Sequence, residues 1–373
     1  MKHFLVLCCF MSYNLSSTIA QENLQTDSNK VNVVIKGLLQ TRFIMSASNG
    51  VDVSGLHHIN EESVNNTFDI KRARIQVTSK ISEHVDVNLL LNMSDFKLDP
   101  KNKVLENACF TYQINPYVNF RMGQFRPAFG LEDMYPVDMI KSMDYSNQYT
   151  AFGNNGWQSF QIGASIYGGI KGRYPLKYEV TVVNGNNRNQ VMDNDNGKYF
   201  SSRLEVSNPT KLPIKVALNG GVGQAFRNKV YAVGIDLSGI ILLNKGWFLE
   251  IEAEAKQGNN HTLFYSLDTN KRDGNLMNYQ MRGFYILPNL RYVINSHYLK
   301  SLEFSCRYEY FDPDFKHAGN FKQVYTPMVS AEFIKTYNFR IQVGANINVY
   351  DKDIPASTQY NSQLFILQIQ SRF

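Results

Sequence analysis

Residues 339–349 read Phe-Arg-Ile-Gln-Val-Gly-Ala-Asn-Ile-Asn-Val. Every second side chain is apolar, and the positions between them are polar or glycine. Alternation with a period of two places one kind of side chain on each face of a β-strand. A strand with one apolar and one polar face suits a half-exposed sheet in water or a barrel in a membrane. The stretch itself predicts a strand, and its surroundings decide between these two settings.

The same alternation recurs along the chain, at residues 85–93, 247–256 and 302–310 among others. These runs last about 10 residues, the length that a tilted strand needs to cross a bilayer, whereas soluble strands usually stop at about 5 or 6. No stretch after the first twenty residues approaches the roughly 18 apolar residues of a membrane helix. The chain is therefore predicted to be all-β and to form a transmembrane antiparallel β-barrel.

The connections between the predicted strands come in two sizes. Short turns such as 244–246 and 336–338 alternate with long polar loops at 46–66, 126–156, 186–198, 258–277 and 351–360. Outer-membrane barrels have short periplasmic turns and longer extracellular loops. The runs number about 16, and an even number places both chain ends on the periplasmic side.

The first twenty residues have the features of a cleaved signal peptide: a positive Lys2, an apolar stretch at 4–11 and a small residue, Ala20, at the end. We expect a signal peptide at 1–20, a short segment at 21–30 and a single barrel at 31–373, exported to the bacterial outer membrane. A lipoprotein anchor at Cys8 or Cys9 is disfavoured, because a large leucine precedes Cys8.

The last predicted strand ends the chain on an aromatic residue. Phe373 shares its face with Phe365 and Ile369, although Ser371 interrupts that face. This ending looks like the one that the outer-membrane insertion machinery recognises. Two cysteines follow the signal peptide, Cys109 and Cys306, and the sequence leaves open whether they are paired.

Two stretches carry a resemblance to a known family. Residues 68–75 read Phe-Asp-Ile-Lys-Arg-Ala-Arg-Ile, and residues 121–132 read Arg-Met-Gly-Gln-Phe-Arg-Pro-Ala-Phe-Gly-Leu-Glu. Together they resemble the phosphate-selective porin O and P family, although Ala128 stands where a second proline is usual. The resemblance implies a homotrimer of 16-stranded barrels, with the loop 126–156 folded into the lumen as the constriction. The constriction residues would then be Arg126, Glu132, Asp133, Asp138 and Lys141.

Eight arginines fall on the faces assigned to the lumen, and we predict that they line an anion pathway: Arg42, Arg72, Arg74, Arg121, Arg203, Arg282, Arg307 and Arg340. A guanidinium group suits phosphate because it donates two parallel hydrogen bonds. The same arginines could instead pair with lumenal carboxylates such as Glu205, Glu250 and Glu309. Both interpretations stay open at this point.

The predicted constriction loop is acidic. It holds Glu132, Asp133, Asp138 and Asp144 against Arg126 and Lys141 alone. Glutamates 250, 252 and 254 add three carboxylates on one lumenal face. Members of the family named for phosphate are expected to have clustered lysines instead. The loop therefore argues against strict phosphate selectivity.

The predicted function is a porin for passive diffusion of small hydrophilic solutes through outer-membrane lipid, with some preference for anions such as phosphate. The alternatives are a non-conducting barrel that serves as a surface scaffold or adhesin, a barrel enzyme, and a soluble secreted β protein. We expect no catalytic residue, cofactor or metal site, because no nucleophile motif is present and the calcium-like stretch 193–197 lacks its closing glutamate. The net charge of +6 is scattered, which argues against nucleic acid.

Overall fold

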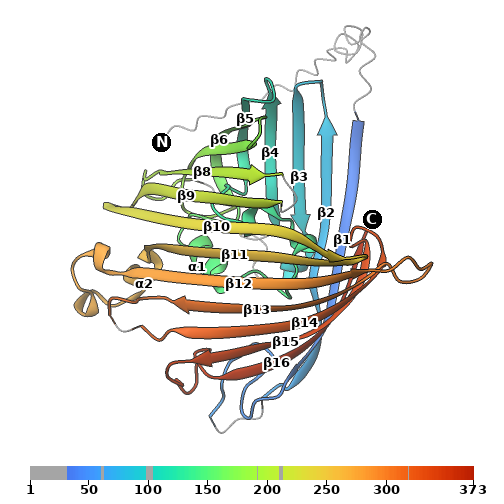
Figure 1. Cartoon of the computed structure of the whole chain (residues 1–373). Helices are drawn as coiled ribbons and strands as arrows, with labels where there is room; N and C mark the ends of the chain where they lie inside the picture. The colour runs from blue at the N-terminus through green and yellow to red at the C-terminus, as the bar shows by residue number, and fades with distance from the viewer. Residues whose placement is uncertain (1–31, 60–62, 98–103, 191, 210–212, 318) are drawn as a thin grey trace, which may run out of the picture.

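The computed structural model describes residues 32–59, 63–97, 104–190, 192–209, 213–317 and 319–373. The predicted signal peptide and the segment 21–30 lie outside these residues. The described chain forms a closed barrel in which each strand pairs antiparallel with its sequence neighbours and the last strand pairs with the first (Figure 1). The predicted 16-stranded antiparallel barrel is confirmed.

The strands are β1 (Asn32–Ser46), β2 (Asn66–Lys80), β3 (Val85–Asn92), β4 (Leu105–Gln113), β5 (Asn119–Phe125), β6 (Gln161–Ile170), β7 (Leu176–Val183), β8 (Tyr199–Asn208), β9 (Ile214–Ala225), β10 (Asn228–Asn244), β11 (Trp247–Asn259), β12 (Gln280–Val293), β13 (Ser301–Asp312), β14 (Lys322–Ile334), β15 (Phe339–Tyr350) and β16 (Ser362–Arg372). β1 begins and β16 ends on the rim that carries the short turns, such as 81–84 and 245–246. Because the longer loops of such barrels are extracellular, we refer to the opposite rim as the extracellular rim.

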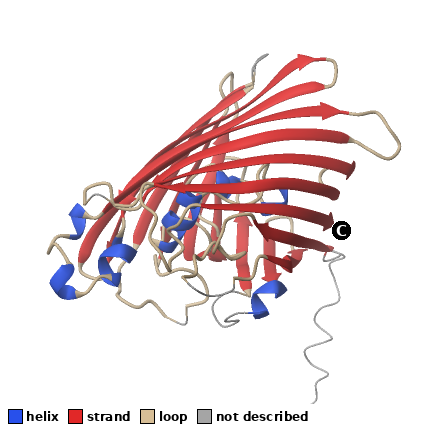
Figure 2. Cartoon of the chain, turned by 90° about the horizontal axis from the view of Figure 1, so that it is seen from below, coloured by secondary structure: helices blue, strands red, loops and turns tan. Residues whose placement is uncertain are grey.

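Two short α-helices lie in the long connections, α1 (Asn147–Asn154) and α2 (His261–Ser266). The 3-10 turns are η2 (Met93–Lys97), η4 (Glu132–Met134), η5 (Val137–Met139), η6 (Thr269–Lys271) and η7 (Leu276–Asn278). In the described part of the chain, no helix is both long enough and apolar enough to span a membrane. Figure 2 shows some loops and short helices among the strands and others beyond the ends of the strands.

The alternation in the sequence becomes two faces of the barrel wall. In β15, the side chains of Arg340 and Gln342 are fully buried, whereas Val343 on the other face is 55% exposed. In β16, Phe365, Leu367 and Ile369 are likewise exposed. An exposed apolar face and a buried polar face suit a wall that contacts lipid outside and polar groups inside.

A hydrophobic cluster lies inside the polar lumen. It joins Phe129, Phe152 and Trp157, from the connection between β5 and β6, to Tyr199 of β8 and Phe264 of α2. Leu276 of η7, Tyr279, Met281 of β12 and Phe311 of β13 extend it. This cluster fills part of the barrel's interior and fixes the connection between β5 and β6 against the wall.

Candidate functional site

The connection between β5 and β6, residues 126–160, is here named the inward segment. Figure 1 shows its helix α1 behind strands β10 and β11, inside the barrel. Arg42 of β1 donates to the Asp144 carboxylate at 2.6 Å, and Arg307 of β13 donates to the Asp144 carbonyl oxygen at 2.6 Å. Arg340 of β15 donates to the carbonyl oxygen of Asp138 at 3.1 Å. The inward segment is thus held by lumenal side chains from several strands.

The inward segment also has internal order. Ser146 caps α1, because its hydroxyl oxygen accepts the backbone N–H of Tyr149 at 3.1 Å. Glu132 accepts the backbone N–H of Ser146 at 2.8 Å and also its hydroxyl. Burial raises the pKa of Glu132, and the nearby Arg307 only partly opposes this effect. These contacts fold the segment back on itself before it meets the wall.

A cavity of about 350 Å³ separates the inward segment from strands β2 to β4. We name it the basic slit. Its charged lining consists of five cations and three carboxylates: Lys71, Arg72, Arg74, Arg126, Arg188, Asp69, Asp95 and Glu106. The lining therefore has an excess of positive charge, although the inward segment as a whole is acidic.

Arg74 and Arg188 reach the slit from different elements and share one partner. Arg74 of β2 lies 2.8 Å from the Glu106 carboxylate, and Arg188 from the connection 184–198 lies 3.4 Å from the same oxygen. Arg188 also lies 3.4 Å from Asp95. Both arginines have side chains that are partly exposed, so they remain able to donate to a passing ion.

Arg126 lies deeper, surrounded by aromatic rings. Its guanidinium carbon lies 5.0 Å from the centre of the Phe160 ring and 5.3 Å from that of Tyr145. The guanidinium group donates to the Tyr145 hydroxyl at 3.0 Å and to the Tyr135 carbonyl oxygen at 2.9 Å. Arg126 is therefore held rigidly, with its charge facing the slit.

A second cavity of about 400 Å³ adjoins the basic slit. The two share Tyr149, Ser159, Phe160 and Arg188 in their linings. The second cavity adds polar side chains from connections at the extracellular rim: Thr150, Asn154, Asn187 and Gln190. Together the cavities mark a polar route past Arg188 toward the slit.

The structure places seven of the eight predicted arginines on the inner face of the wall. Six of these pair with carboxylates: Arg42 and Arg72 with Asp144, Arg74 with Glu106, Arg121 with Glu179, Arg203 with Asp236, and Arg307 with Glu309. Arg340 donates to backbone oxygens of the inward segment. Most of these arginines therefore anchor the wall or the segment, and only Arg72 and Arg74 line the slit.

Arg282 is an exception that corrects our prediction. It shares its face of β12 with the exposed Phe284 and Ile286, and its own side chain is 49% exposed. The lumenal face of β12 carries Tyr285 and Leu287 instead, which are buried. Arg282 thus lies on the outer face, because the period of two across Arg282, Phe284 and Ile286 places all three together.

The predicted constriction residues divide between two roles. Arg126 lines the slit. Asp133 accepts Gln158 at 2.7 Å, Asp138 pairs with Arg372 at 2.8 Å, and Lys141 lies 3.0 Å from both Glu250 and Glu252. The acidic groups of the segment are thus engaged with the wall or with the segment itself, and Glu132, Asp133 and Asp138 are absent from the slit lining.

Arg188 was not among the predicted residues, because it stands between two asparagines in a polar loop with no strand periodicity. Only the folded chain brings it to Arg74 and Glu106. The three glutamates of β11 all have cationic partners. Glu250 and Glu252 pair with Lys141, and Glu254 pairs with Lys256 at 2.5 Å. This row fastens the inward segment opposite the slit.

Comparison with known proteins agrees with this geometry. Residues 43–217 match the family model of phosphate-selective porin O and P. The chain is an outer-membrane porin. The match includes β2, β5 and the whole inward segment, so the resemblance predicted from 68–75 and 121–132 is confirmed. A comparison with curated protein sequences gives no match.

Solved structures of outer-membrane channels share the fold. The anion-selective porin from Comamonas acidovorans has a TM-score of 0.60 at 9% identity, over 92% of this chain and 100% of that one. OmpF of Salmonella typhi, solved with daunomycin, has a TM-score of 0.60 at 11% identity, over 91% and 97% of the two chains. The outer membrane channel DcaP of Acinetobacter baumannii has a TM-score of 0.57 at 10% identity, over 93% and 99%. At such identities these likenesses establish the fold of the chain, which is that of outer-membrane porins.

Proposed function

We propose that this porin passes small hydrophilic solutes by passive diffusion and favours anions such as phosphate. The observation that carries the proposal is the basic slit, where five cations face three carboxylates beside the inward segment. A lumen with excess fixed positive charge concentrates anions and repels cations. The anion-selective porin from Comamonas acidovorans, which has the same fold, supports this direction.

The slit offers donors that can replace part of an ion's water. Arg74 and Arg188 contact the same oxygen of Glu106, and both side chains are partly exposed. Such a group donates two parallel hydrogen bonds to an oxyanion. The shared carboxylate weakens each arginine's hold on the ion, which suits conduction, because an ion must leave as readily as it enters.

The proposal assigns roles to the remaining predicted residues. Arg72, Arg74 and Arg126, joined by Lys71 and Arg188, form the anion pathway at its narrowest described part. Asp138, Lys141, Arg307 and Arg340 position the inward segment as the constriction. The family is one of channels, so the proposal includes no reaction, cofactor or catalytic residue.

The proposal also includes a homotrimer in outer-membrane lipid. A trimer form has been solved for the outer membrane protein OmpT of Vibrio cholerae, which matches this chain with a TM-score of 0.55 at 11% identity. Each barrel of the trimer would hold its own basic slit, because the slit lies between the inward segment and the wall of the same barrel. Cross-linking of the protein in native membranes tests this part of the proposal.

Single-channel recording tests the anion preference. The refolded porin should show step conductance, and its reversal potential in a salt gradient should indicate anion selectivity. The double variant Arg74→Glu, Arg188→Glu should lower the anion-to-cation permeability ratio by about fivefold for each unit of charge changed, since a partly screened charge near the ion is worth roughly 1 kcal/mol. Lys335→Glu, in a periplasmic turn, changes the net charge far from the slit and serves as the control.

Each outcome separates the alternatives. Steps with an unchanged reversal potential in the double variant would mean that the slit is not the ion pathway. A wild-type protein that folds and inserts but gives no steps would favour the non-conducting surface scaffold. Phosphate added as a competitor should reduce chloride current in the wild type and less in the double variant.

A further inference from the structure

Two troughs lie side by side on the outer surface of the barrel, away from the pore. The first, of about 540 Å³, spans β10 to β13, and the second, of about 630 Å³, spans β8 to β10. Both volumes fall in the range of small-molecule sites, about 300–1,000 Å³. They meet along β10, where residues 229–231 line one trough and residues 233–235 the other.

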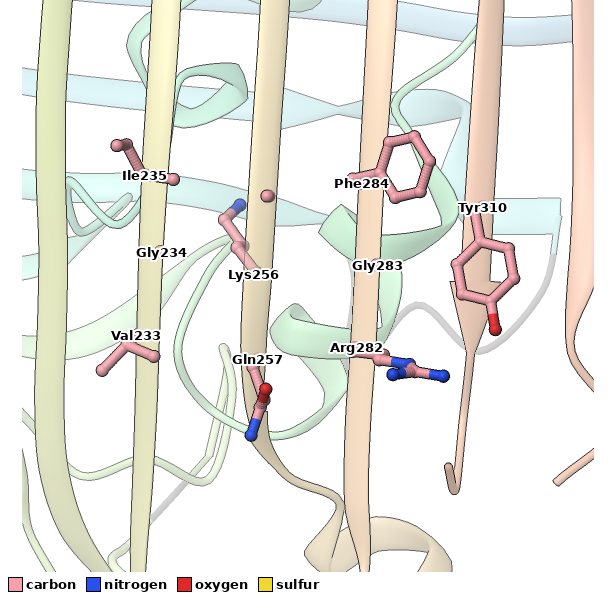
Figure 3. A pocket seen from close by; sticks show the side chains of 10 residues that line it. Val233, Gly234, Ile235, Lys256, Gln257, Arg282, Gly283, Phe284 and Tyr310 are labelled. Carbon is pink, nitrogen blue, oxygen red and sulfur yellow. The ribbon is translucent and has the colours of Figure 1, made fainter. Parts of the chain in front are cut away.

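The first trough has a small floor and apolar walls (Figure 3). Ala255 of β11 pairs with Ile235 of β10 on one side and with Phe284 of β12 on the other. The larger side chains of Ile235 and Phe284 flank the alanine and form the sides of the trough, and Tyr310 of β13 extends one side. Exposed apolar surface dominates the lining, which fits a hydrocarbon chain better than water.

The second trough repeats this arrangement on the neighbouring strands. Phe200 of β8, Val222 of β9 and Tyr231 of β10 form one row of paired residues that points outward. Gly223, whose position faces the lumenal Tyr199, contributes only its backbone to the lining. Phe200 and Val222 are 55% and 63% exposed, so the trough is open to the membrane.

Cationic side chains stand at the extracellular end of both troughs. Arg282 is the third residue of β12 and lines the first trough, whereas Lys198 and Lys229 lie at the ends of β8 and β10 and line the second. Arg282 has one ion-pair partner, Asp312, at 3.7 Å, and its side chain is 49% exposed. Lys198 pairs with Asp193, and Lys229 is exposed.

A cationic side chain on the outward face of a barrel strand is energetically costly if it lies within the bilayer. An outward arginine or lysine costs roughly 2–4 kcal/mol at the bilayer midplane and about 0–1 near the interface. The position of Arg282 near the rim places it at headgroup depth. There an arginine finds phosphate groups, to which its planar fork donates two parallel hydrogen bonds.

We propose that the two troughs form one binding site for a phosphorylated, multi-acylated glycolipid of the outer leaflet. Acyl chains lie in the two troughs, and two phosphates meet Arg282 and Lys229. Charge complementarity and the pairing of each trough with a basic residue carry this assignment. A glycolipid with two phosphates and several acyl chains can fill both troughs and pair with both basic residues at once. A phospholipid with one phosphate can pair with only one of these basic residues. The site is independent of conduction, because none of its exposed side chains lines the slit.

Native mass spectrometry of the detergent-solubilised porin tests the site. The probes are hexa-acylated lipid A with two phosphates, its monophosphorylated form and phosphatidylglycerol. The wild type should retain the two-phosphate lipid about tenfold more than phosphatidylglycerol, with the monophosphorylated form between them, since one charge-assisted hydrogen bond is worth about that factor. The double variant Lys229→Glu, Arg282→Glu should abolish this difference.

A second variant tests the trough itself. Ala255→Trp fills the floor of the first trough and should lower retention of lipid A, whereas Ala331→Trp places the same ring on the outer face near the other rim and should not. Ala331 pairs with the outward residues Leu302 and Ile341, so it is a matched control. Folding of each variant is checked by its heat-dependent shift on a denaturing gel.

Two results would overturn the proposal. One is equal retention of all three lipids by the wild type and by Lys229→Glu, Arg282→Glu. The other is a change in oligomeric state with Ala255→Trp while lipid retention stays constant, because the trough would then be a contact between copies of the chain. Step conductance measured on the same samples reports on the pore separately, so a failure of the slit does not count against the lipid site.

Discussion

Asp144 pairs with three lumenal cations of strands β1 and β2. Its carboxylate lies 2.6 Å from Arg42, 3.2 Å from Arg72 and 3.6 Å from Lys71. Burial by itself would raise the pKa of Asp144, but the three cations outweigh burial and hold the pKa well below its usual range. Asp144 thus ties the inward segment to β1 and β2 while neutralising part of the charge beside the slit.

Replacing Asp144 with asparagine should therefore separate stability from selectivity. The change leaves Arg42, Arg72 and Lys71 without their shared carboxylate, and we expect the folded barrel to lose roughly 2–4 kcal/mol in urea unfolding. The anion-to-cation permeability ratio should rise, because one negative charge leaves the lumen. Urea titration and reversal potentials measure the two effects on the same sample.

The pH dependence gives a second check on Asp144. A carboxylate whose folded pKa is lowered contributes its full stability above its unfolded pKa and loses it as the pH falls through the folded value. The difference in stability between the wild type and Asp144→Asn should thus be constant from about pH 5 to pH 8 and shrink only in strong acid. A difference that disappears near neutral pH would contradict the ion cluster.

At the scale of elements, helix α2 joins an extracellular connection to the wall. Asn260 caps the helix by accepting the backbone N–H of Leu263 at 3.1 Å. His261 packs edge-on against Tyr199 of β8, with ring centres 6.1 Å apart, and its Nδ1 lies 3.4 Å from the tyrosine hydroxyl. Burial lowers the pKa of His261 from 6.5 to about 4, so the docked helix holds a neutral imidazole.

This burial predicts that the connection 260–279 loosens in mild acid. Because the docked His261 has the lower pKa, docking is fully stable above about pH 6.5 and weakens as the pH falls from there toward 4, by about 2 kcal/mol at about pH 5. Amide hydrogen exchange of residues 262–279, corrected for the intrinsic effect of pH, should speed up between about pH 7 and about pH 5. In His261→Gln the exchange should not depend on pH over this range.

At the scale of the whole molecule, the two cysteines in the described part of the chain lie on opposite faces of the wall. Cys109 of β4 is buried and Cys306 of β13 is exposed, and both are free. Cys306 shares its face with Phe304, which is 44% exposed, in the middle of its strand. The fold therefore places the Cys306 thiol in the lipid part of the membrane.

Maleimide labelling of the intact porin tests this orientation. In membranes, an apolar, lipid-soluble maleimide should modify Cys306, whereas a charged maleimide supplied from water should leave it unmodified. Cys306→Ser should remove the labelling by the apolar reagent. Rapid reaction of Cys306 with the charged reagent would show that the outer face of β13 is not in lipid.

The features of the fold that could be predicted from the sequence are those that depend on the local alternation of apolar and polar residues. The alternation at 339–349 placed Arg340 and Gln342 inside and Val343 outside, as observed. The period of two, the run length and the two sizes of connection sufficed for the 16-stranded barrel. The face of Arg282 was misjudged because a glycine follows it at the start of its strand, where apolar neighbours that define the face come only later.

The site was predictable in part. The sequence pointed to Arg72, Arg74 and Arg126, which line the slit, but it also made the inward segment acidic and thus suggested an acidic constriction. The folded chain turns Asp133, Asp138 and Lys141 toward the wall or the segment itself. It brings Arg188 into the lining from a loop without any periodic signal.

The sequence by itself determined the membrane barrel, through the alternation of residues 339–349 and its repeats, the length of these runs and the two sizes of connection. The face of each strand residue follows from its neighbours two positions away, so this information is local. Only the tertiary structure decided which charges remain available in the lumen. Asp144 and Arg42 lie 102 residues apart in the chain, and Arg188 and Glu106 lie 82 apart. Pairing over such separations depends on how the inward segment docks, so the positive charge of the slit is a property of the closed barrel.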